Sequence, residues 1–289
     1  TGVAERNTSL GKSQLPSQRL VYESKLLNVL KSCEAALTKE NESNQRNAAL
    51  AATIASWREQ KTQDYSKTWA NLVQGSQELR LALNTPERLF SVEDNKDALS
   101  SVNALYYINS LSNKGLLLSD MYSSNTASSD TETEATNENN SESIIESSEL
   151  EQQLKIIRSA RLPATLWHTQ QTLTQNLSLL TNMLETELDA VSCPEGRASD
   201  KAKILRNVFY LFFIEEIQPV GSLVNQYHYK LAPLWEDWLA QPSLHEEFKR
   251  YIRQQSQDGF NQYSSVMKAH VNLWQGFLGR CNLSPVAPV

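Results

Sequence analysis

Apolar residues recur at three- and four-residue spacings along most of this chain, and this period constrains the fold more than any other feature. Between Ser17 and Leu37 the pattern forms one continuous apolar stripe, as on an amphipathic helix packed against a core. The 289 residues include only nine Gly and nine Pro, too few for the many tight turns of a β-sandwich or barrel. We therefore predict an all-α fold, a multi-helix bundle with long helices.

The same spacing predicts the other helices. They span residues 47–60, 65–72, 76–83, 91–120, 144–161, 164–191, 201–218, 219–238, 244–257 and 260–278. The segment from Ile204 to Ile217 is apolar on most sides, which is typical of a buried central helix. The longest strongly apolar run, 208–214, is seven residues long, whereas a membrane-spanning helix needs about 20.

Residues 123–149 form an acidic, low-complexity insert, with seven acidic residues and no Lys or Arg. Such a composition cannot bury enough apolar surface to offset the entropy of ordering, so we expect a disordered insert. It separates an N-terminal helical half, residues 1–122, from a C-terminal half, residues 150–289, and we expect both halves to form one domain. Without the insert the chain has 26 acidic and 27 basic residues, and this near-neutral balance argues against a nucleic-acid partner.

No residue pattern for catalysis, metal binding or cofactor binding stands out. The string Gly11-Lys12-Ser13 lacks the first Gly of a phosphate-binding loop, and no two histidines have the spacing of a zinc site on one helix. We therefore expect no catalytic residue, no metal and no cofactor. The alternative is a hydrolase whose site assembles from distant helices, which requires His168, His228 or His270 to meet a carboxylate or a Cys.

Two loops beside expected helix starts are rich in basic residues. The candidates for binding an anion there are Arg6, Asn7, Arg19, Arg197, Lys203 and Arg206. Free backbone donors and the helix dipole favour anions at such positions, and Arg binds carboxylate or phosphate groups with two hydrogen bonds. Alternatively, these side chains bond to helix-end carbonyls or to Glu23, Glu215 and Glu216.

The three cysteines are widely spaced. Cys193 lies in a loop and Cys281 lies just beyond the last predicted helix, where a disulfide commonly joins loop and chain end. The other reading is a reducing compartment in which all three, Cys33 included, are inert thiols. Spacing alone leaves both readings open.

Two stretches carry more specific residue strings. The first has AERNTSLGK at 4–12 and PSQRL at 16–20; the second has CPEGR at 193–197, ILRNVF at 204–209 and Gln218-Pro219. Together they resemble the bacterial domain-of-unknown-function family 3080, found in gammaproteobacterial proteins that begin with a lipoprotein signal. The resemblance covers most of the chain apart from the acidic insert, and Thr8 departs from it where the family has Ser.

This resemblance implies a location, without an activity. It implies a periplasm-facing lipoprotein with a lipid-anchor Cys upstream. The start of the chain, where no charged-then-apolar leader is present, separately leads us to expect that Thr1 lies at a cut inside a longer precursor. The resemblance also implies a further Cys just before Thr1 as the partner of Cys33, and so favours a disulfide between Cys193 and Cys281.

From these observations we expect a non-catalytic interaction or scaffold protein of the cell envelope. An upstream lipid anchor would hold it at a membrane in the periplasm, and its partner would be an unknown envelope protein. The alternative is a binding protein for an anionic envelope ligand, which requires the two arginine-rich loops to meet in one electropositive pocket. The hydrolase described above is the second alternative.

Overall fold

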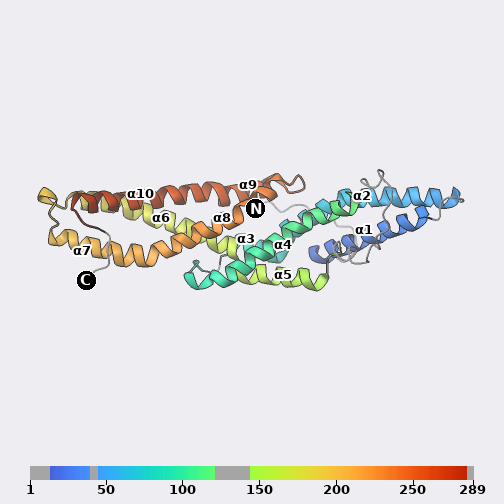
Figure 1. Ribbon diagram of the computed structural model, residues 1–289, viewed down its shortest axis with the longest axis horizontal. Coiled ribbons are helices and arrows are strands. Elements are labelled where there is room, and N and C mark those ends of the chain that lie inside the picture. Colours follow the sequence, from blue (N-terminus) through green and yellow to red (C-terminus); the bar gives the residue numbers. More distant parts are fainter. Residues whose placement is uncertain (1–13, 40–44, 87, 121–143, 285–289) are drawn as a thin grey trace, which may run out of the picture. The chain divides into compact units, whose positions relative to one another are not determined.

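The computed structural model describes residues 14–39, 45–86, 88–120 and 144–284, and every regular element within these ranges is a helix (Figure 1). The predicted all-α fold is thus confirmed. Most of the predicted acidic insert lies outside the described residues. Its last three residues, 147–149, belong to the first turn of a helix.

The chain divides into two compact units. The first combines residues 1–77 with 110–153, and the second combines residues 78–109 with 154–289. These bounds differ from those of the predicted halves, since 78–109 pack with the C-terminal segment. That the two halves form one domain stays a prediction.

In the first unit two long helices lie side by side (Figure 1). Its elements are α1 (Pro16–Lys39), α2 (Gln45–Gly75), the end of α4 (Asn95–Asp120) and the start of α5 (Ser147–Ala160). The Glu23 carboxylate of α1 is buried, where it pairs with Arg19 and, at 3.1 Å, with the Lys61 ammonium of α2. The predicted helices 47–60 and 65–72 are one helix, because no Gly or Pro interrupts α2 before Gly75.

The second unit contains the remaining elements. They are α3 (Gln77–Asn84), η1 (Val92–Asp94), α6 (Leu162–Asp189), η3 (Pro194–Gly196), α7 (Asp200–Val208), η4 (Phe209–Ile217), α8 (Gln218–Ala240), α9 (Glu246–Arg253), η5 (Gln254–Asp258) and α10 (Gly259–Arg280), with the first part of α4 and the last part of α5. Helices α6 and α10 run side by side, and α7, η4 and α8 form one continuous helical run (Figure 1).

Two tyrosine hydroxyls join residues 78–109 to the C-terminal helices. Tyr227 donates a hydrogen bond to the Asn95 carbonyl oxygen at 2.7 Å, and Tyr251 donates one to that of Leu83 at 2.7 Å. Each bond crosses more than a hundred residues of sequence. They explain why this part of the N-terminal half belongs to the second unit.

Helices α7 and α9 both continue as π-helices, η4 and η5, whose wider turns are frequent at functional sites.

The predicted burial of the 204–217 segment is wrong. Ile204 is 62 % exposed and Phe212 is 65 % exposed, while only Phe209 and Phe213 of η4 are buried. The helix is apolar on most sides, but within the second unit only the side with these two phenylalanines packs into the core.

A disulfide between Cys193 and Cys281 joins the loop before α7 to the end of α10. Asn282 has a positive φ of 49°, and the next N–H, of Leu283, donates to the Leu278 carbonyl oxygen at 2.9 Å. This is the hydrogen bond of a Schellman-type helix end. Gly196, with φ of 74°, packs so closely on Asn282 that a Cβ there would collide with the Asn282 side-chain amide.

We predict that Gly196→Ala lowers the free energy of unfolding by about 1–3 kcal/mol, because it adds both backbone strain and a collision. Gly276→Ala is the matched control: Gly276 lies inside α10, and its added Cβ would meet nothing within 4 Å. This variant should gain about 0.5–1 kcal/mol from helix propensity. Urea unfolding without reductant measures both, and equal effects would contradict the prediction.

Candidate functional site

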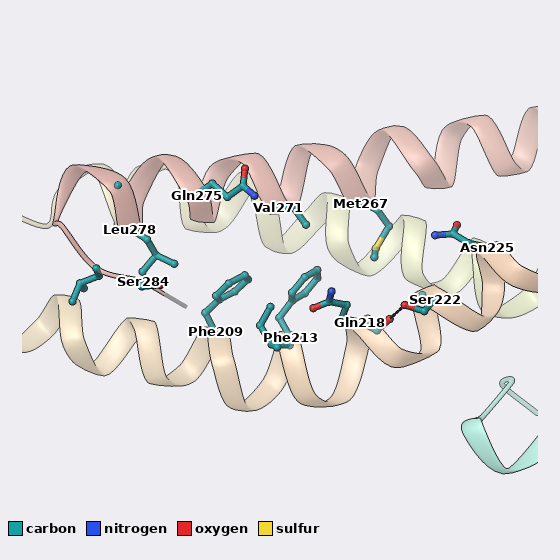
Figure 2. A pocket seen from close by; sticks show the side chains of 14 residues that line it. Phe209, Phe213, Gln218, Ser222, Asn225, Met267, Val271, Gln275, Leu278 and Ser284 are labelled. Atoms are coloured by element: carbon teal, nitrogen blue, oxygen red, sulfur yellow. Dashed lines mark hydrogen bonds between the residues drawn. The ribbon is translucent and has the colours of Figure 1, made fainter. Parts of the chain in front are cut away.

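A groove of about 590 Å³ lies between η4–α8 and α10 in the second unit (Figure 2). We call it the apolar groove. Its apolar lining is Phe209, Phe213, Ile214, Met267, Val271, Leu278 and Leu283, and its polar lining includes Gln218, Ser222, Asn225, Gln275 and Ser284. None of the described residues that line it is charged. Its volume lies in the range of ligand pockets, roughly 300–1,000 Å³.

Stacked aromatic rings form the inner wall of the apolar groove. Phe209 and Phe213 stack with ring centroids 5.2 Å apart, and Phe209 also stacks on Trp274 of α10 at 4.7 Å. Figure 2 shows the two phenylalanine rings projecting from η4 toward α10, with Val271 and Met267 projecting from the facing helix. These large rings hold the two helices apart, so the space beside them stays open.

Contacts between chain segments lie near both ends of the groove. At one end Gly221 of α8 approaches α10, where its carbonyl oxygen accepts a hydrogen bond from the Tyr263 hydroxyl at 3.1 Å. A Cβ at Gly221 would meet the Met267 methyl at 2.9 Å, so this flexible side chain would have to shift to admit it. At the other end the disulfide holds the turn after α10, and Leu283 and Ser284 line the groove there.

His270 packs against this wall, and both nitrogens of its imidazole ring form hydrogen bonds. Its Nδ1 is 2.9 Å from the Thr181 hydroxyl, whose own proton goes to the Leu177 carbonyl oxygen. The hydroxyl therefore accepts from Nδ1–H, while Nε2 accepts from the Trp274 indole N–H at 3.2 Å. The ring is thus neutral, and burial lowers its pKa.

His228 is partly buried, and its ring stacks face to face on Phe260 with centroids 3.3 Å apart. Burial lowers the pKa of this imidazole to about 4. Within the described ranges, none of His168, His228 and His270 pairs with a carboxylate or a cysteine. The pairing that the hydrolase alternative requires is therefore not present among these residues.

A second apolar feature lies on the outer side of the same helical run. Val208, the last residue of α7, and Phe212 of η4 precede Phe209 and Phe213 by one residue. They therefore form the neighbouring row of the same helical run and continue the line of Ile204 on α7. Leu211, 44 % exposed, widens this surface. We call Ile204, Val208, Leu211 and Phe212 the exposed row.

The described members of the predicted anion-binding set each contact a neighbouring side chain. Arg6 and Asn7 lie outside the described residues, and Arg19 of the first unit pairs with Glu23. In the second unit Arg197 pairs with Glu195 at 3.3 Å, and Lys203 pairs with Asp200 at 3.2 Å. Arg206 donates to the side-chain oxygen of Asn207 at 2.9 Å. An anion site formed by these six residues stays a prediction.

The described part of the chain holds no cluster of three or more His, Cys, Asp or Glu side chains suited to a metal ion. None of its helices is long and apolar enough to cross a membrane. Cys33 is an exposed free thiol.

Sequence reasoning missed the polar groove residues Gln218, Asn225 and Gln275, because isolated amides at helical spacing have no signature. The available signal was the excess of apolar residues in 204–217, more than one buried side can use. That excess was interpreted as complete burial, whereas it supplies both the groove wall and the exposed row.

The fold and the site define an all-helical protein with a disulfide-closed end and an uncharged groove. A family model described as "Protein of unknown function (DUF3080)" matches residues 2–131 and 121–285, and the chain belongs to this family. No curated protein and no solved structure matches it. The resemblance to family 3080 is confirmed.

Lowered histidine pKa values predict that acid destabilises the folded chain. Below about pH 6.5 the unfolded chain binds protons at His228 and His270, whereas the folded chain does not until lower pH. The free energy of unfolding therefore falls as the pH is lowered from 7 toward 4.

His228→Gln should reduce this loss between pH 7 and pH 5 by about 1–2 kcal/mol. Urea unfolding at both pH values measures it, with His168→Gln at an exposed position as the control. An unchanged pH dependence in His228→Gln would show that His228 titrates alike in both states.

Proposed function

We propose that this protein is a non-catalytic interaction protein of the bacterial cell envelope, and that its apolar groove receives an apolar segment of a partner protein. An upstream lipid anchor holds it at a membrane, with the described helices on the periplasmic side. The observation that carries the proposal is the exposed row beside the groove, since contiguous exposed apolar side chains mark interaction sites.

The chemistry of the groove favours a protein segment over a small charged ligand. Its inner wall is aromatic and aliphatic, and no charged side chain of the described residues lines it. The amides of Gln218, Asn225 and Gln275 can donate to and accept from a peptide backbone. The exposed row extends the apolar surface along η4 beyond what a compact ligand would cover.

Two observations support the envelope location. The Cys193–Cys281 disulfide is of a kind that persists in oxidising compartments such as the bacterial periplasm. The resemblance to family 3080 implies a lipoprotein, which accords with a membrane anchor upstream of the described helices.

Photo-crosslinking in cells that make the full-length protein tests the proposal. Benzoylphenylalanine at Gln275, on the groove wall, should give a discrete crosslinked protein. The same probe at Ala269, exposed on the opposite side of α10, should not. Identical products from both positions, or none from Gln275, would contradict it.

A pair of surface variants then tests the exposed row. Phe212→Ser should weaken the Gln275 crosslink severalfold without lowering the melting temperature, because the ring is 65 % exposed. Tyr229→Ser removes a ring that is 66 % exposed on α8 and should leave the crosslink unchanged. An undiminished crosslink in Phe212→Ser would show that the exposed row does not contact the partner.

A further inference from the structure

A second groove of about 590 Å³ lies elsewhere in the second unit, between α6 and the continuous run α9–η5–α10. In contrast to the apolar groove, polar side chains form most of its lining. Six glutamines line it: Gln170, Gln171, Gln175, Gln254, Gln255 and Gln262. We call it the amide groove.

Gln170 is the most informative residue of the amide groove. It is 3 % exposed, and its side-chain amide makes no hydrogen bond with any described residue. The amide nitrogen packs against Gly259, where an added Cβ would lie 2.9 Å from it. The Gln170 amide lines the groove and is not among the side-chain groups that are sealed from solvent without a partner, so it is free to bond to a ligand there in place of water.

The charged residues of the amide groove differ in whether they already form an ion pair. Arg250 pairs with Glu247 on the same helix. Arg253, one turn further along, forms no ion pair or hydrogen bond with any described residue. Asp258 also lines the groove. A ligand would therefore meet one uncommitted guanidinium, which favours a carboxylate or phosphate, and one carboxylate that accepts from hydroxyl groups.

The rest of the lining narrows the class of ligand. Its one aromatic ring, Trp167, is 5 % exposed and packs on Trp235 and Tyr251, so it offers little face to a nucleobase or an apolar side chain. Glutamine amides both donate and accept hydrogen bonds, as sugar hydroxyls do.

We propose that the amide groove binds a sugar that carries one anionic group, a carboxylate or a phosphate. Arg253 binds the anion, and the Gln170 amide and the other glutamines bind the hydroxyl groups. This site is separate from the apolar groove and does not depend on the proposed partner.

Isothermal titration calorimetry with three probes tests the proposal on the full chain. The probes are galacturonic acid, glucose 1-phosphate and uncharged cellobiose. At least one anionic sugar should bind, at least tenfold more tightly than cellobiose, and the stronger of the two identifies the anion. No binding of either anionic sugar at millimolar concentration, or equal binding of cellobiose, would overturn it.

Two variants test whether the sugar binds in the amide groove. Arg253→Gln should weaken the anionic sugar about tenfold, as loss of a charge-assisted hydrogen bond does. Arg158→Gln removes an exposed arginine of α5 that pairs with no residue in the described ranges, and it should leave the affinity unchanged. Equal affinity in both variants would overturn the assignment.

Gln170→Leu separates a ligand-binding amide from a structural one. It should abolish sugar binding while keeping or raising the melting temperature, because it removes a buried amide that has no partner in the described chain. A lower melting temperature with unchanged affinity would contradict the role given to Gln170.

Discussion

The disulfide between Cys193 and Cys281 is the constraint on which the candidate site depends. It closes a separation of 88 residues, which the chain-entropy model values at on the order of 4 kcal/mol. It fixes the loop that starts α7 to the turn that ends α10, and the contact of Gly196 with Asn282 sets that turn. The stacked rings of Phe209 and Phe213 then hold η4 beside α10 at a distance that leaves the apolar groove open.

The two grooves of the second unit differ in chemistry and are each associated with a π-helix. Beside η4, aromatic and aliphatic side chains face an uncharged space, which suits an apolar segment of a protein. Beside η5, glutamine amides and an uncommitted arginine face a polar space, which suits an anionic sugar. An envelope protein that binds both a partner segment and a saccharide would need two different grooves. An apolar lining cannot form the hydrogen bonds that a saccharide requires, and a polar lining does not favour an apolar segment.

Much of the fold could be predicted from the period of apolar residues, and the site could not. The stripe of 17–37 predicted α1 with nearly its observed bounds, and the small number of Gly and Pro residues favoured long helices. Period shows which sides of a helix are apolar but not which sides other helices cover, so the exposure of Phe212 was missed. The environment of Gln170 could not be predicted for a related reason. Its burial and its lack of a partner among the described residues depend on helices that are distant in sequence, and a single glutamine has no local sequence signature.

The most direct test of the central claim is the redox state of Cys193 and Cys281 in protein taken from the envelope of cells that make it. The protein is denatured in iodoacetamide without reductant, digested and mapped by mass spectrometry. The account predicts one linked peptide pair that contains Cys193 and Cys281 and becomes alkylated only after reduction. Full alkylation of both cysteines before reduction would contradict the disulfide-closed end and, with it, the proposed oxidising compartment.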